Sequence, residues 1–169
     1  GKTLLTDPWL IGSCYWRSWW NYPPVGKKII EELKPPDVIY ISHIHWDHFH
    51  GITLKRFPKD TLIIVPYERS TRMVRDLNRM HFKNIIELPH GKSFNIEDDF
   101  QIFSYQFFPW GDSALVVKGE GIILLNSNDA KFMGGPLRQI LRKHDSIDFA
   151  FRSHASANDR LCYEYTDDA

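Results

Sequence analysis

The sequence predicts an α+β protein in which two layers of strands lie between outer layers of helices. Short apolar runs rich in β-branched and aromatic residues indicate strands, and stretches with apolar residues three and four apart indicate helices. Along the 169 residues, strand runs, helices and strands again all lead into polar loops at one edge. This order favours a four-layer αβ/βα sandwich over a parallel doubly wound sheet.

The first half of the chain supplies strands that alternate with helices. Residues 2–6 predict a strand that ends at Asp7-Pro8, and residues 38–41 predict a short buried strand. Residues 25–34 predict an amphipathic helix, which Pro35-Pro36 stops. By the same reasoning we expect a short helix at 52–56, a buried strand at 61–66, a helix at 70–80 with Ser70 as N-cap, and a strand at 84–88.

Strands dominate the second half of the chain. Alternating residues at 100–108 and 113–118 predict two strands that are joined through a turn. A further strand at 121–126 precedes a helix at 136–143, which carries apolar residues on one face. The last predicted strand, at 147–152, ends at Ser153-His154.

The composition is that of one domain, spanning residues 1–169, with 43% hydrophobic residues to fill a core. The 21 Lys and Arg residues balance 21 Asp and Glu residues, so no net field recruits nucleic acid or an anionic membrane. Cys14 and Cys162 are too few for a disulfide framework and indicate reduced thiols in a cytoplasmic protein. No signal peptide opens the chain, and no run approaches the ~20 apolar residues of a membrane span.

Chemistry concentrates in the run Ser42-His43-Ile44-His45-Trp46-Asp47-His48-Phe49-His50, directly after a predicted strand. In an extended segment His43 and His45 point to the same side, so two imidazoles can hold one ion. Asp47 and His48 follow as the chain turns and can face a second ion. Imidazole nitrogen and carboxylate oxygen bind both zinc and iron(II), so the residue types predict a metal site without choosing the metal. A histidine-rich surface loop fits this spacing less well.

This motif, Ser-His-x-His-x-Asp-His after a hydrophobic strand, resembles the signature of the metallo-β-lactamase fold superfamily. Within the superfamily, the chain is most similar to the catalytic domain of the CMP-N-acetylneuraminate hydroxylase group. The pieces that carry this resemblance are Asp7-Pro8-Trp9-Leu10-Ile11-Gly12, Trp19-Trp20, Pro23-Pro24, Tyr40-Ile41-Ser42-His43, Leu125-Asn126, Gly134-Gly135 and Asp148-Phe149-Ala150.

The resemblance implies further roles. Asp129 stands where the family places a carboxylate that bridges two metal ions. Asp7 stands where the family has an aspartate that orders the metal loop by accepting hydrogen bonds, although a simple Asx turn before Pro8 fits the residues equally well. The family fold normally has an earlier hairpin and later elements, so we expect this chain to be incomplete at the termini, trimmed or unusually compact.

One position departs from the family pattern. Members usually carry another histidine at the turn before the strand predicted at 113–118, and here Phe108 occupies that position. Because phenylalanine cannot bind a metal, the first ion must lose a ligand or borrow one. His90, at a strand end expected on the same edge, is our candidate substitute, and His154 follows the final strand where hydrolytic members place their last histidine. Asp112 is also within reach, but we expect it to cap its own turn together with Ser113.

The loop at residues 14–24 is unusually aromatic, with Trp16, Trp19 and Trp20 close to Arg17. Such rings stack on a sugar or a base, and the guanidinium pairs with a phosphate or carboxylate, so we predict substrate contacts here. The alternative is a hydrophobic lid that packs on the sandwich. A nucleic-acid platform fits less well, because no basic stripe accompanies the rings.

The metal decides between the functions that remain. Iron held by histidine and aspartate, with open positions, suits dioxygen chemistry and predicts a hydroxylase acting on a sugar-nucleotide-like or other small molecule. The resemblance and the missing histidine favour this function. Hydroxylases of this group take electrons from a Rieske cluster, and the chain lacks the Cys-x-His and Cys-x-x-His pairs of such a cluster. Three alternatives stay open: the electron-transfer domain is absent, it is a separate partner, or the reaction does not need one.

Two other functions stay open. With zinc, one or two ions per chain would activate water for the hydrolysis of a lactone, ester, amide or phosphodiester, and Asp47 would orient or deprotonate that water. A metal-binding module without catalysis is the second alternative, and the missing histidine makes it possible. The retention of five ligands together argues against it: His43, His45, Asp47, His48 and Asp129.

Overall fold

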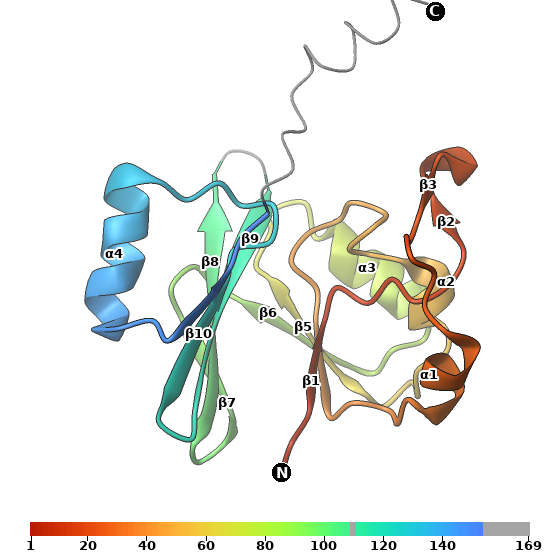
Figure 1. Cartoon of the computed structure of the whole chain (residues 1–169), viewed down its shortest axis with the longest axis horizontal. Helices are drawn as coiled ribbons and strands as arrows, with labels where there is room; N and C mark the ends of the chain where they lie inside the picture. The colour runs from red at the N-terminus through yellow and green to blue at the C-terminus, as the bar shows by residue number, and fades with distance from the viewer. Residues whose placement is uncertain (109–110, 154–169) are drawn as a thin grey trace, which may run out of the picture.

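The computed structural model describes residues 1–108 and 111–153, which form two facing sheets (Figure 1). The first sheet has parallel strands in the order β1 (Leu4–Thr6), β4 (Val38–Tyr40), β5 (Leu62–Pro66) and β6 (Asn84–Leu88). The second has the order β11 (Phe149–Phe151), β10 (Ile122–Asn126), β9 (Asp112–Gly119), β8 (Phe100–Phe107) and β7 (Ser93–Glu97). In this sheet β10 and β11 pair in parallel, and the other neighbours pair antiparallel.

Helices cover the outer faces of both sheets (Figure 1). The helices α1 (Lys27–Glu32), α2 (Gly51–Leu54) and α3 (Arg72–Arg79) lie on the side of the first sheet, and α4 (Gly134–His144) lies beyond the second. This order of layers confirms the predicted αβ/βα sandwich. No helix in the described ranges is both long and apolar enough to cross a membrane.

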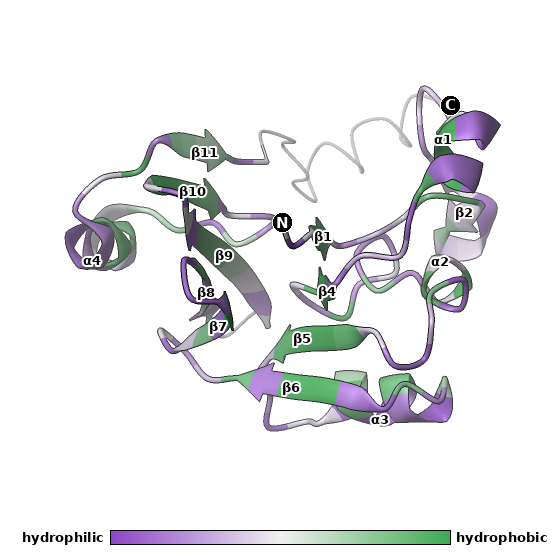
Figure 2. Cartoon of the chain, turned by 90° about the horizontal axis from the view of Figure 1, so that it is seen from below, coloured by the Kyte–Doolittle hydropathy of each residue, from purple (hydrophilic) through white to green (hydrophobic). Residues whose placement is uncertain are grey.

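Alternation along the strands gives the first sheet two apolar faces. Ile39 and Ile63 belong to one buried cluster with Leu54 of α2 and Leu77 of α3. Tyr40 and its neighbours on the other face join a second cluster that includes residues of β8 and β9, so this cluster lies between the sheets. Parallel strands buried on both faces read as continuous apolar runs, which explains why 38–41 and 61–66 were predictable. The hydrophobic colouring of β5 in Figure 2 shows this pattern.

Some strands differ from the sequence prediction. A small antiparallel hairpin, β2 (Ser13–Cys14) and β3 (Trp19–Trp20), lies within the aromatic loop and is too short to give a periodic signal. The strand β7 does alternate: Phe94 and Ile96 pack on the cluster between the sheets, and Ser93, Asn95 and Glu97 are exposed. This period-two pattern was present in the sequence, and we did not predict a strand from it.

Candidate metal centre

Five of the predicted metal residues lie at one edge of the sandwich, where β4 and β10 end and β9 begins (Figure 1): His43, His45, Asp47, His48 and Asp129. The strand β4 leads into residues 42–50, which we call the metal loop. Within this loop the Phe49 amide donates to the His45 carbonyl at 2.6 Å, so the segment forms a tight turn. His50 is used differently from the other imidazoles, because its Nδ1 accepts a hydrogen bond from the Thr53 amide and caps α2.

His43, His45 and Asp129 form the first group of converging donor atoms. Nε2 of His43 lies 2.8 Å from Nδ1 of His45 and 3.9 Å from Oδ2 of Asp129. One ligand atom from each residue lies within 4.8 Å of the others, a spacing that suits a single ion. The two histidines act from the same side of the chain, as their spacing of two residues predicts.

Asp47, His48 and Asp129 form the second group. Nε2 of His48 lies 3.3 Å from Oδ2 of Asp47 and 3.3 Å from Oδ2 of Asp129. These donor atoms also lie within 4.8 Å of one another. Because Asp129 belongs to both groups, its carboxylate is placed to bridge two ions.

Asp112, the first residue of β9, lies beside the first group. Its Oδ1 is buried without a hydrogen-bond partner and lies 3.7 Å from Nε2 of His43. Burial raises the pKa of this carboxyl group. Our expectation that Asp112 caps its own turn is wrong, because the Ser113 hydroxyl donates instead to the Ser42 carbonyl at 2.7 Å. The sequence did offer one signal that Asp112 lies near the metal: the turn between the two predicted strands was expected at the same edge of the sandwich as the metal loop.

Side chains outside the two groups fix the orientation of the imidazoles. Asp7 accepts hydrogen bonds from the Ser42 amide at 2.7 Å and the Ser42 hydroxyl at 2.6 Å, and its Oδ2 lies 2.9 Å from Nδ1 of His48. Nδ1 of His43 lies 2.9 Å from the Ser42 hydroxyl. The rings of His43 and His48 are therefore held through Nδ1, while Nε2 of each ring faces the converging ligands. Proteins usually orient metal-binding histidines in this way.

The electrostatics of the site favour a cation. Burial is the main cause that lowers the pKa of His43 to about 4, so this ring is neutral and able to bind a metal. Burial opposes a charge on His48, but hydrogen bonds with Asp129, Asp47 and Asp7 raise the pKa of His48 to about 12. Burial likewise opposes the charge of Asp47, and hydrogen bonds from His48 and Tyr15 lower its pKa. Carboxylates that stabilise an imidazolium so strongly also attract a metal ion.

A cavity of about 440 Å³ opens beside the metal ligands. The residues that line it are Trp19, Asp47, Asp112, Ser127, Asn128, Asp129, Ala130, Lys131, Arg152 and Ser153. Of the aromatic loop residues that we predicted as substrate contacts, Trp19 is one of these, whereas Trp16, Arg17 and Trp20 are not. Sequence reasoning missed both cations of the cavity, Lys131 and Arg152, because neither belongs to a motif.

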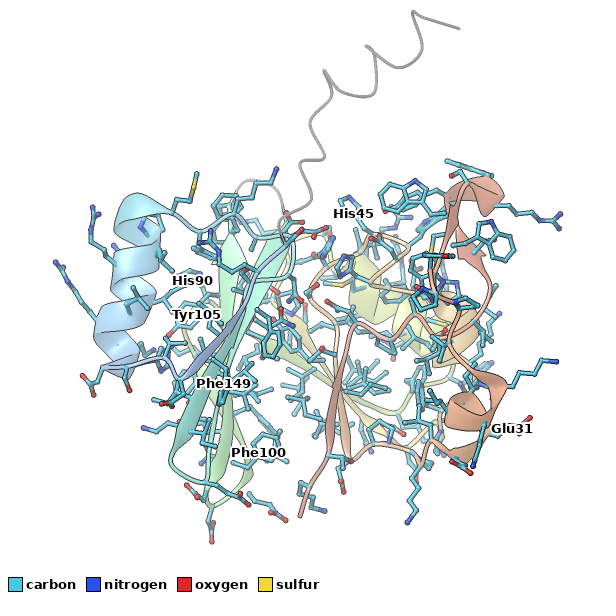
Figure 3. All side chains as sticks on the ribbon, in the orientation of Figure 1. Glu31, His45, His90, Phe100, Tyr105 and Phe149 are labelled. Atoms are coloured by element: carbon cyan, nitrogen blue, oxygen red, sulfur yellow. The ribbon has the colours of Figure 1, made fainter. Side chains whose placement is uncertain are left out.

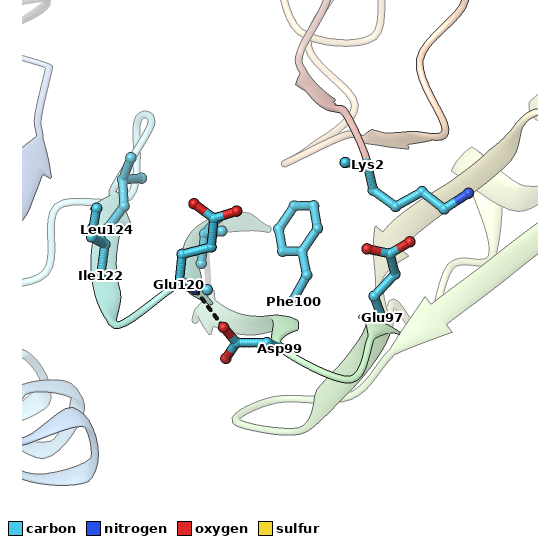
Figure 4. A pocket seen from close by; sticks show the side chains of 10 residues that line it. Lys2, Glu97, Asp99, Phe100, Glu120, Ile122 and Leu124 are labelled. Carbon is cyan, nitrogen blue, oxygen red and sulfur yellow. Dashed lines mark hydrogen bonds between the residues drawn. The ribbon is translucent and has the colours of Figure 1, made fainter.

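A second cavity of about 420 Å³ lies at the opposite end of the strands, where the β7–β8 and β9–β10 turns meet the start of the chain (Figure 4). Carboxylates of Glu97, Asp99 and Glu120 surround apolar side chains there, and the Glu120 amide donates to Asp99 at 2.9 Å. None of the described residues that line this cavity is a histidine, so they do not provide the nitrogen ligands of the metal centre.

The other predicted residues lie apart or outside the described ranges. His90 is not brought to the metal groups; its Nδ1 accepts a hydrogen bond from the Gln106 amide, and its ring packs edge-on against Tyr105 (Figure 3). His154 lies outside the described residues. Trp16 and Trp20 are 85% and 63% exposed, which argues against a lid packed on the sandwich.

Relatives of the chain include hydroxylases. Over 134 residues it is 30% identical to the cytidine monophosphate-N-acetylneuraminic acid hydroxylase of Danio rerio, a match that covers 76% of this chain and 23% of the relative. Over 138 residues it is 29% identical to a Mycolicibacterium smegmatis protein named as a Rieske 2Fe-2S iron-sulfur protein, covering 76% of this chain and 26% of that one. The chain thus spans about a quarter of the length of these relatives.

Solved structures share the fold at low sequence identity. An isothiocyanate hydrolase from Delia radicum gut bacteria superposes with a TM-score of 0.70 at 18% identity, over 94% of this chain and 67% of that one. The diiron β-hydroxylase CmlA from Streptomyces venezuelae gives 0.71 at 16% identity, over 98% of this chain and 34% of that one. The sequence model described as "Beta-lactamase superfamily domain" matches residues 1–147, and the chain therefore belongs to the β-lactamase superfamily.

Proposed function

We propose that this chain is the catalytic domain of an iron-dependent oxygenase that hydroxylates a small anionic molecule. The observation that carries this proposal is the ligand set around His43 and His45, which a carboxylate of Asp129 or Asp112 completes. Two histidines and one carboxylate, with positions left open, are typical of non-haem iron(II) oxygenases. Iron bound by these residues would supply dioxygen activation. Asp47, His48 and Asp129 would hold a second ion.

The unpartnered oxygen of Asp112 supports a metal in this position. A buried carboxylate oxygen without a hydrogen-bond donor is unfavourable unless a cation compensates it. Asp112 would then take the place of the histidine that superfamily members usually carry, which neither Phe108 nor His90 fills. The proposed ligand set thus contains as many carboxylates as imidazoles, and mixed histidine and carboxylate ligation with open positions is the pattern of non-haem iron(II) sites.

The cavity supports a sugar-nucleotide-like or similar anionic substrate. Trp19 offers an aromatic face for a sugar or base, and Lys131 and Arg152 offer cations for a phosphate or carboxylate. The Danio rerio relative is named as a hydroxylase of a cytidine monophosphate sugar acid, which has both kinds of group. Asp47 also lines the cavity, where its ionised carboxylate can accept a proton or orient water beside the substrate.

Hydroxylation with dioxygen also consumes two electrons, so we propose a separate reduced iron–sulfur protein or domain as the donor. The name of the Mycolicibacterium smegmatis relative, of which this chain spans 26%, supports a donor of this class.

The test is oxygen consumption by protein loaded anaerobically with iron(II). We expect uptake that requires both a chemical reductant and cytidine monophosphate-N-acetylneuraminate, with one labelled oxygen atom from dioxygen in the product by mass spectrometry. The matched control is the zinc-loaded protein under the same conditions. Uptake that is independent of every anionic substrate tried, or that needs no iron, contradicts the proposal.

A zinc-dependent hydrolase is the alternative, and the observation that favours it is the position of Asp47, which belongs to the second group and also lines the cavity. With zinc, bound water would have a pKa near ~7, and Asp47 would orient that water toward an ester, lactone, amide or phosphodiester. Turnover of such a panel by zinc-loaded protein, with no oxygen uptake by the iron form, would establish the hydrolase. Metal-loaded protein that turns over nothing in either assay is a binding module.

A further inference from the structure

The β2–β3 hairpin reaches from outside both sheets to the metal loop, next to α2 (Figure 1). Two hydrogen bonds join it to consecutive residues of that loop. The buried Cys14 thiol donates to the Trp46 carbonyl at 3.2 Å, and the Tyr15 hydroxyl donates to Oδ1 of Asp47 at 2.8 Å. The hairpin therefore holds the segment that presents Asp47 to the second metal group.

The backbone conformation that directs the Tyr15 side chain toward Asp47 is energetically unfavourable by itself. Tyr15, Trp16 and Arg17 have φ angles of 47°, 55° and 70°, the left-handed region that non-glycine residues seldom adopt. Three such residues in succession persist only when the surroundings determine them, and strain of this kind gathers at functional sites. Aromatic contacts supply that support here. The Tyr15 ring stacks on the Trp46 ring with 5.7 Å between the ring centroids, and it packs edge-on against Trp19 with 4.9 Å between the centroids.

The two oxygens of Asp47 have different partners. Oδ2 lies 3.3 Å from Nε2 of His48, on the side of the converging metal ligands. Oδ1 accepts the hydrogen bond from Tyr15. A ligand carboxylate held through its second oxygen has a fixed orientation, which is the usual effect of an outer partner on a metal ligand.

We propose that Tyr15 is a positioning residue, which fixes Asp47 as a ligand of the ion shared with His48 and Asp129. This inference rests on the metal centre of the proposed function, but it does not depend on whether that centre activates oxygen or water. Its specific content is a difference between the two ions: Tyr15 touches a ligand of the second ion and none of the first. The turn Tyr15–Arg17, in which Tyr15 is partly buried and the other two residues are exposed, thus serves the metal rather than the core.

The experiment is a titration of the full chain with Co²⁺ alone, followed by visible absorption and calorimetry, for the wild type and Tyr15→Phe. We expect Tyr15→Phe to weaken one of two binding events by about 10–100-fold, the range for loss of an outer partner, and to leave the other unchanged. Phenylalanine keeps the stacking, and circular dichroism with a thermal scan of the metal-free protein checks the fold. The matched control is Tyr22→Phe, which removes a hydroxyl that is nearly fully exposed.

A double-variant cycle separates positioning from a merely structural role. In an Asp47→Ala background, Tyr15→Phe should have no further effect on Co²⁺ affinity, because its partner is gone. Equal weakening of both binding events, an unchanged affinity, or additive effects in the cycle would each overturn the inference, as would a wild type that binds no second ion. Oxygen-uptake and hydrolysis assays on the wild type decide the proposed function separately.

Discussion

The two sheets contribute to the candidate metal centre in different ways. Among the described residues, the parallel sheet supplies the imidazoles of the site and Asp47 from one loop after β4. Within the same residues, the mixed sheet supplies carboxylates, Asp129 from the loop after β10 and Asp112 from the start of β9. Ligands that share a loop are fixed by local geometry, whereas the carboxylates reach the site only if the two sheets pack correctly. A metal held by both would join the sheets at this edge.

The sharpest test of this comparison is Asp129→Ala, which removes the one carboxylate shared by both groups. We expect Co²⁺ affinity to fall more than about 100-fold at both sites, well beyond the loss of an outer partner, and activity to disappear. Metal content by mass spectrometry after dialysis is the measurement. The Asp129 side chain is 44% exposed, so the metal-free variant should still fold, and a thermal scan checks this.

The control for this variant is Asp98→Asn, an exposed position in the β7–β8 turn. Retention of two ions by Asp129→Ala would show that the imidazole loop binds metal without the second sheet, and the contrast between the sheets would be lost.

A smaller effect is expected at Asp112. Asp112→Asn should weaken the ion at His43 and His45 by about 10-fold, because a neutral amide is the poorer ligand. The same variant should stabilise the metal-free fold by about 1 kcal/mol, since it removes the charge of a carboxyl group whose Oδ1 is buried without a hydrogen-bond partner. Asp112→His, which puts an imidazole beside the first group, should shift the metal bound in an equimolar iron and zinc mixture toward zinc. Unchanged affinity together with unchanged stability would show that Asp112 faces no ion.

These residues also show what the sequence could predict. The metal loop was predictable because its ligands are close together in the sequence and follow a buried strand. The period-two alternation of side chains in an extended segment then places His43 and His45 on the same side. Asp129 was found only through the family resemblance. Asp112 was misassigned because its environment depends on a neighbouring sheet: its Oδ1 lies beside His43, and the expected partner Ser113 bonds to Ser42. Such contacts between distant segments leave no periodic pattern.

The contacts of the aromatic loop were also only partly predictable from the sequence. Composition indicated substrate contacts at four positions, and the hairpin turn brings Trp19 alone among them to the cavity. Tyr15, which contacts Asp47, had no distinguishing feature in sequence, because its position depends on three successive left-handed residues. No propensity predicts such a run in residues other than glycine.

The contact between the sheets can be tested below the metal loop, at the fully buried Tyr40. The Ser113 hydroxyl donates to Ser42, so Tyr40 donates to Ser113 at 2.7 Å and accepts from Ser104 at 2.8 Å. Tyr40→Phe removes both hydrogen bonds and leaves the buried Ser104 hydroxyl without this acceptor, so it should cost about 1–3 kcal/mol of unfolding free energy, measured by urea denaturation. Tyr67→Phe, at a half-exposed tyrosine, is the control. A loss no larger than that of the control would show that this network does not hold the sheets together.

The smallest expected effect distinguishes the outer faces of the sheets. Leu54 and Leu77 pack on the first sheet as apolar side chains, whereas α4 brings the buried His144 against the second, 2.7 Å from the Tyr105 hydroxyl. Burial, aided by the charges of Lys143 and Lys118 and opposed by Asp145, lowers the pKa of His144 in the folded protein. As pH falls through about 6.5, the unfolded chain therefore binds a proton that the folded chain does not, and stability falls.

For one proton the slope of this loss is at most about 1.4 kcal/mol per pH unit. We expect His144→Gln, which keeps an acceptor for Tyr105, to flatten the dependence of the metal-free unfolding free energy between pH 7 and 5 (roughly the range in which histidine titrates). His81→Gln, at an exposed histidine, should leave the slope as it is. If His144→Gln retains the full slope, His144 does not cause the pH dependence of the unfolding free energy. The contrast between the outer faces of the two sheets would then be lost.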